Sequence, residues 1–134
     1  MTRWQDIALA PLPRGWSDAT QVTLLGPLHG AVQESVVVTF DSVKGPLAGV
    51  VEAQCRELAR TTTAYAKGAR TPKRVGATEG VMQAHRFESG GHALAQLQLF
   101  VPRAGGVCTL TFTTTAAAFD ERVAEQMIGL VSLE

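Results

Sequence analysis

The segment between residues 81 and 114 constrains the fold of this 134-residue chain most strongly. Three β-rich stretches, at residues 81–87, 93–101 and 107–114, are separated by the glycine pairs Gly90-Gly91 and Gly105-Gly106. Glycine pairs between strand-like stretches are typical of hairpin turns, because glycine supplies the positive φ that tight turns need. The pattern therefore predicts an antiparallel meander of three strands.

The remaining chain predicts further strands and two helices around this meander. We expect short strands at residues 5–9, 21–25 and 35–40, and amphipathic helices at residues 47–65 and 119–131. A polar, basic connector is expected at residues 66–74. The predicted order is β-β-β-α-β-β-β-α. This order indicates one α+β domain over residues 1–134, with a mostly antiparallel sheet and two main helices.

Gln54 occupies an unexpected place in the first predicted helix. At 100° per residue it lies close to the middle of the apolar stripe formed by the residues around it, such as Val50, Val51 and Leu58. A primary amide facing a core has two donors and an acceptor to satisfy, and failure to do so costs about 1–3 kcal/mol. Either the fold or a binding partner must satisfy it.

The strand at residues 93–101 raises the same question. Its odd positions are apolar and predict a core face, whereas Gln96 and Gln98 share the other face with Leu94 and Phe100. Neighbouring strands could add further neutral polar groups to that face, namely Gln83, His85, Thr109, Thr111 and Thr113. A solvated sheet face usually carries Lys, Glu or Arg. We therefore expect something largely apolar to cover this face: a binding partner, the second helix or a dimer partner.

Composition and motifs exclude several classes of function. The 12 basic and 12 acidic residues balance, so we expect no nucleic-acid partner, and the basic residues between Arg60 and Arg74 are read as a solvated loop. Neither a secretory signal nor a bilayer-spanning apolar run is present, which predicts a cytoplasmic protein without stable membrane insertion. No spacing of His or Cys predicts a metal, a cofactor or a nucleophile, so we expect no enzyme. Cys55 and Cys108 are read as core residues, although a disulfide between them stays open.

The order of short motifs resembles a known family. A Pro-Arg-Gly-Trp-Ser-Asp segment at residues 13–18 precedes a β-branched strand that ends near Asp41. The motifs that follow are Gln54 in its helix, Gln-Leu-Phe-Val at residues 98–101, Leu-Thr-Phe-Thr-Thr-Thr at residues 110–115 and a terminal amphipathic helix. This arrangement covers nearly the whole chain. It resembles the DcrB-related proteins, which have a PsbP-like α+β fold, and among them the Eag chaperones of type VI secretion.

The resemblance implies a small homodimeric chaperone without a cofactor. Its partner would be the N-terminal hydrophobic, transmembrane helices of a secreted effector, which it would help to load on the secretion spike protein. An interaction domain for another partner, such as an immunity or assembly factor, is the alternative. The partner-binding residues predicted in this way are Gln54, Gln98, Gln96, Gln21, Thr23, Val36 and Val38.

One position departs from the family pattern. Members place aliphatic residues at the fifth and seventh positions after the tryptophan, whereas this chain has Gln21 and Thr23 there. Val22 and Leu24 are expected to face the other way, unless the register shifts by one residue. A more polar groove is the consequence of the unshifted register.

Overall fold

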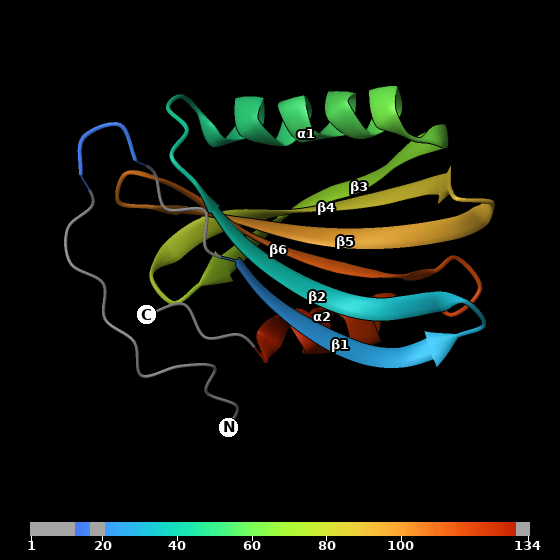
Figure 1. The fold of residues 1–134 in the computed structure, drawn as a ribbon. Helices are drawn as coiled ribbons and strands as arrows, with labels where there is room; N and C mark the ends of the chain where they lie inside the picture. Colours follow the sequence, from blue (N-terminus) through green and yellow to red (C-terminus); the bar gives the residue numbers. More distant parts are fainter. Residues whose placement is uncertain (1–12, 17–20, 131–134) are drawn as a thin grey trace.

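The computed structural model describes residues 13–16 and 21–130 and arranges them in three layers, helix on sheet on helix (Figure 1). Six antiparallel strands form one sheet in the order β1-β2-β6-β5-β4-β3. The two helices lie on opposite faces of this sheet. The predicted α+β class is therefore confirmed. The elements are β1 (Gln21–His29), β2 (Val32–Asp41), α1 (Leu47–Thr61), β3 (Thr63–Val75), β4 (Thr78–Ser89), β5 (His92–Arg103), β6 (Gly106–Thr115) and α2 (Glu121–Gly129).

The predicted meander is confirmed as β4, β5 and β6, which pair in sequence order. Gly90, Gly91 and Gly105 have φ of 59°, 81° and 82°, the left-handed region that the hairpin turns require. The alternation of β5 is confirmed as well, because Leu97, Leu99 and Val101 belong to one core cluster.

The region after α1 differs from the prediction. The helix ends at Thr61, and Ala64 has a φ of 54°, so Tyr65 belongs to β3 and not to the helix. The connector predicted at residues 66–74 is wrong, because these residues form most of β3. This strand is at an edge of the sheet, where charged side chains reach water without a burial cost, so its polar sequence conceals a strand. The strand predicted at residues 5–9 lies outside the described residues.

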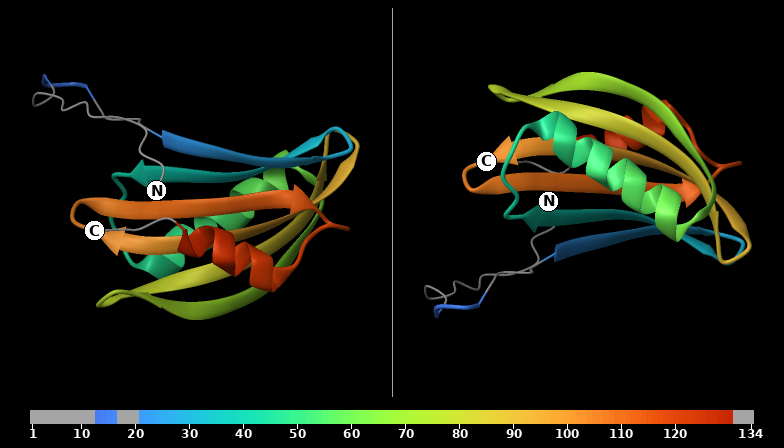
Figure 2. Two further views of the ribbon diagram at one scale, coloured as in Figure 1. Left: turned by 90° about the horizontal axis from the view of Figure 1, so that it is seen from below. Right: turned by 90° about the horizontal axis from the view of Figure 1, so that it is seen from above.

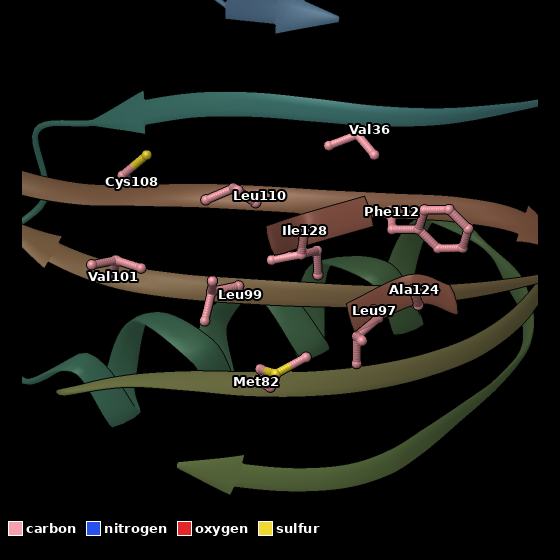
Figure 3. Packing of buried hydrophobic residues seen from close by; sticks show 10 residues of the cluster. All are labelled: Val36, Met82, Leu97, Leu99, Val101, Cys108, Leu110, Phe112, Ala124 and Ile128. Carbon is pink, nitrogen blue, oxygen red and sulfur yellow. The ribbon is translucent and has the colours of Figure 1, made fainter. Parts of the chain in front are cut away.

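The main core lies between the sheet and α2 (Figure 3). Asp120 starts this helix, because its carboxylate accepts hydrogen bonds from the backbone N–H groups of Arg122 and Val123. The main cluster consists of Val36, Met82, Leu97, Leu99, Val101, Cys108, Leu110, Phe112, Ala124 and Ile128.

A smaller cluster lies between the sheet and α1, and it contains Val51, Cys55, Phe100 and Val107. Cys55 and Cys108 are both free, and they belong to the clusters on opposite faces of the sheet. A disulfide between them is thereby excluded.

Helix α1 covers only part of its face of the sheet. It packs on β3, β4 and β5, and the sheet curves so that β3 and β4 approach the helix while β1 lies farthest from it (Figure 1). The view from above shows α1 crossing the strands obliquely (Figure 2). The α1-facing side of β1, β2 and β6 is the region where a binding surface could lie.

Candidate binding face

Nine side chains without a formal charge form a grid on the α1-facing side of β1, β2 and β6. Residues paired across antiparallel strands project to the same face, so the strand register defines three rows. We call this grid the uncharged face; its rows are Gln21–Thr39–Thr109, Thr23–Val37–Thr111 and Leu25–Ser35–Thr113. Leu25 is 70% exposed, and Thr109, at 7%, is the buried member. Six hydroxyl or amide side chains at the surface thus lie among two aliphatic ones.

Gln54 lies at the helix side of this region. Its half-buried side chain and Val50 line a cleft of about 380 Å³ between the first turns of α1 and the loop that follows β2. Among the described residues, none makes a hydrogen bond with the Gln54 amide. Asp41 at the end of β2 and Lys44 of the loop also line this cleft, so its outer end is charged. The amide donors and acceptor of Gln54 are open to an incoming molecule.

Gln98, in contrast, is satisfied by its own chain. It is 4% exposed, and its Oε1 lies 2.7 Å from His85 Nε2. Its Nε2 donates to Thr111 Oγ1 at 3.0 Å. Two residues away along the same pair of strands, Gln96 Nε2 donates to Thr113 Oγ1 at 3.0 Å. The buried Oε1 of Gln96 has no hydrogen-bond partner within residues 13–16 and 21–130.

A second polar group fills the space between α1 and β3. Gln83 is fully buried; its Oε1 accepts from Arg70 Nε at 2.7 Å, and its Nε2 donates to the carbonyl oxygens of Gly68 and Ala84 at 3.0 and 2.8 Å. Arg70 also forms an ion pair with Glu52 of α1. The network fixes the helix to the edge strand, and each buried amide group of Gln83 has a partner.

The electrostatics of this network keep His85 neutral. Burial, together with the nearby charge of Arg70, lowers the pKa of His85, although its hydrogen bond to Gln98 acts in the opposite direction. Hydrogen bonds from Arg70 and Lys67 lower the pKa of Glu52. Burial, and next a hydrogen bond with the Cys55 side chain, raises the pKa of Tyr65. A neutral histidine carries one N–H, and its two partners must therefore differ in role.

The structure separates the seven predicted residues into two groups. Gln54, Gln96, Gln98, Gln21 and Thr23 all lie on the α1 side of the sheet, and the unshifted register of β1 is confirmed. Val22 and Leu24 pair with Val38 and Val36 on the other side.

Val36 and Val38 are the exceptions. Val36 is 4% exposed within the main core, and Val38 packs against that core. They project from β2 toward the α2 side, so a partner on the uncharged face would not touch them. Alternation along the strand carries this information, since Val37 and Thr39 are the residues of β2 that share a face with Thr111 and Thr109.

The structure also shows groups that the sequence pattern did not identify. Arg70, Tyr65 and Glu52 were outside the predicted site, because reading residues 66–74 as a connector removed β3 from the sheet. Ion pairs now account for four of the basic residues: Arg60 with Glu57, Lys67 and Arg70 with Glu52, and Arg74 with Glu79.

The residues with metal-binding or nucleophilic side chains are dispersed or buried in the described part of the chain. Within it, no group of three or more His, Cys, Asp or Glu side chains could hold a metal ion. Cys55 and His85 are 2% and 1% exposed, so a substrate could not reach either without displacing α1. None of the helices that the structure describes is long and apolar enough to cross a membrane.

Comparison with known proteins identifies a shared fold. No family model and no curated protein matches the sequence. The structure is similar to that of PA94 from Pseudomonas aeruginosa, a protein of unknown function, with a TM-score of 0.76 and 22% identity over 92% of this chain and 89% of that one. It is also similar to LpqN, involved in cell envelope biogenesis of Mycobacterium tuberculosis, with a TM-score of 0.57 and 11% identity over 89% and 84% of the two chains. These likenesses establish the fold.

Proposed function

We propose that this chain is a DcrB-related chaperone or adaptor of the Eag type, which binds and shields the N-terminal hydrophobic segment of a type VI secretion effector. In this role it would act in the cytoplasm, as a homodimer and without enzymatic activity, and would help to load the effector on the secretion spike. The observation that carries the proposal is the uncharged face beside Gln54. The order of family motifs along the sequence supplies the identity of the cargo.

The chemistry of the uncharged face suits an apolar guest. A transmembrane helix outside its membrane exposes hydrophobic side chains, and covering them releases about 25 cal/mol for each Å² removed from water. A charged face would lose its hydration under such a guest, at a cost of several kcal/mol per unpaired ion. Threonine, serine and glutamine present methyl and methylene groups together with polar atoms. They can therefore be covered at a lower cost.

Gln54 adds polar recognition at the edge of this surface. Its amide has no partner among the described residues. It can donate to a carbonyl oxygen and accept from a hydroxyl or amide of the guest, without the desolvation cost of an ion. Leu25 of β1, which is 70% exposed, and Val37 of β2 supply apolar contacts for the guest. Many proteins bind an amphipathic or apolar helix in a groove beside one of their own helices.

Co-expression tests the proposal directly. An effector's N-terminal hydrophobic segment, fused to a reporter, should remain in the soluble fraction with this chain and aggregate without it. Val37→Lys places a cation in the middle row of the uncharged face and should abolish the protection. Ala59→Lys places the same cation at an exposed position of α1 and should leave it intact. Equal solubility of the segment with and without the wild-type chain would refute the proposal.

A further inference from the structure

The hydrogen bonds beneath α1 form a chain with a defined direction. Its direction is fixed at Gln98, whose Oε1 lies 2.7 Å from His85 Nε2. An amide oxygen can only accept, so a neutral His85 carries its proton on Nε2. The other ring nitrogen, Nδ1, is then an acceptor, and Tyr65 Oη lies 2.7 Å from it. The phenol of Tyr65 therefore donates to Nδ1.

The same direction continues to the uncharged face. A neutral His85 that accepts at Nδ1 carries its proton on Nε2, and this N–H donates to Gln98 Oε1 at 2.7 Å. The amide is thereby oriented with its Nε2 toward β6, where it donates to Thr111 Oγ1 at 3.0 Å. The oxygen of Thr111 is now an acceptor for Gln98. Its own hydrogen finds no acceptor among the described residues, and it is free to donate to a guest.

Thr113 repeats this arrangement two residues further along β6. Its oxygen accepts from Gln96 Nε2 at 3.0 Å, and its hydrogen likewise has no acceptor within the described ranges. Both threonines are half-buried. Residues two apart on a strand are separated by roughly 6.8 Å. The uncharged face therefore offers two hydroxyl donors along β6, about 7 Å apart. Each hydroxyl is oriented by a hydrogen bond from a glutamine of the neighbouring strand β5.

We infer that Thr111 and Thr113 recognise the guest by donating hydrogen bonds to its backbone carbonyl oxygens. Gln98 and Gln96 act on the guest through these threonines, as positioning residues. The inference rests on the proposed function and specifies which apolar segment the face selects. That segment is a helix with small residues, such as glycine or alanine, at two positions four apart.

Geometry and charge favour this guest over others. Carbonyl oxygens four residues apart along a helix are separated by roughly 6 Å, close to the spacing of the two hydroxyls. Small side chains at those positions leave the carbonyls accessible, and each carbonyl oxygen retains a lone pair for a second hydrogen bond. An acidic group would also accept, but the uncharged face holds no cation to compensate its desolvation. The axis of the guest helix would then lie along β6, in either chain direction.

The direction of the chain can be measured without any guest. ¹⁵N NMR of the histidine-labelled full chain, assigned with a His85→Gln variant, distinguishes the two neutral tautomers of His85. We expect the proton on Nε2. A proton on Nδ1 would reverse every bond from Tyr65 to Thr111, so that Thr111 donates to Gln98 and not to a guest. That result would overturn the inference and leave the proposed function standing.

Binding of defined peptides tests the recognition itself. The probe is a Lys-flanked leucine helix with glycine at two positions four apart, and its control carries leucine at both. The glycine peptide should bind more tightly to the wild-type chain. Thr111→Val removes the hydroxyl without a change of shape and should weaken its binding about five- to tenfold, as expected for one lost hydrogen bond. Thr111→Ser should restore the binding.

Gln98→Glu separates the inferred role from a purely structural one. A carboxylate cannot donate to Thr111, so the threonine would turn its own hydrogen inward, and binding should fall as far as in Thr111→Val. The double variant should be no weaker than either single variant. Unchanged affinity in a folded Thr111→Val or Gln98→Glu protein refutes the inference alone. Failure of both peptides and of the effector segment to bind the wild-type chain refutes the proposed function with it.

Discussion

Truncation of two glutamines should have very unequal effects on stability. Gln98→Ala removes a 4%-exposed side chain that joins His85 to Thr111, whereas Gln54→Ala removes a half-buried side chain that makes no hydrogen bond within the described residues. In Gln98→Ala, the buried N–H of His85 loses its acceptor, at about 1–3 kcal/mol. The space left by the amide adds a cavity cost of about 1 kcal/mol. We expect a total loss of about 2–4 kcal/mol.

For Gln54→Ala the free energy of unfolding should change by less than about 0.5 kcal/mol. In a domain of this size, 1 kcal/mol shifts the melting temperature by roughly 4 °C. Gln98→Ala should then melt about 8–16 °C below the wild type, and Gln54→Ala within about 2 °C of it. Thermal melts and urea unfolding followed by circular dichroism measure both values.

The two variants should also differ in binding. Gln54→Ala should weaken capture of an effector segment while its melting temperature stays unchanged, because the amide is available only to a guest. Gln98→Ala should lose stability and capture together. A Gln98→Ala protein that melts at the wild-type temperature would contradict the account of the buried network. A Gln54→Ala protein as unstable as Gln98→Ala would show that the helix amide is structural.

Three further predictions follow from the same contacts. Because the pKa of His85 is lowered in the folded state, the unfolded chain binds its proton first, and stability should fall as the pH drops below about 6.5; urea midpoints between pH 8 and 5 should decline less steeply in His85→Gln. Glu52→Gln should reduce stability at pH 7, and the difference in stability from the wild type should vanish below the depressed pKa of Glu52, where the wild-type carboxyl is protonated too. Urea midpoints of the two proteins that still differ at low pH would contradict this. Gly80→Ala should destabilise by about 1–3 kcal/mol, since its Cβ would meet the backbone oxygen of Phe100 at 2.7 Å, and chemical unfolding against the exposed control Gly129→Ala measures it.

Local pattern was sufficient for the meander and for the faces of β5. Leu97 and Leu99 alternate with Gln96 and Gln98, and a period of two assigns them to opposite sides without any tertiary knowledge. Edge strand β3 could not be found in this way, because solvent access favours Lys67, Arg70 and Lys73 there. Glu52 of α1, which pairs with Lys67 and Arg70, lies 15 and 18 residues away from them in sequence. A pattern read over a few neighbouring residues cannot identify such a partner.

The amides illustrate the same limit at the candidate site. The sequence indicated that Gln98 and Gln54 both face inward, and it assigned them the same role. Whether such a side chain finds a partner depends on which residue of a neighbouring strand lies opposite. The register places His85 and Thr111 within reach of Gln98, while Gln54 lies beside a cleft.

The two outermost strands of the described sheet each contain a proline. Pro27 lies in β1, where the pairing with β2 skips from Leu25 to Leu28, and Pro72 lies in the basic edge strand β3. A proline lacks the N–H that an added strand would need, and the irregularity in β1 and the cations of β3 further impede ladder growth. We therefore expect these edges to resist strand-by-strand association between copies of the chain. Its contacts are directed to the broad side of the sheet, where a helix can dock.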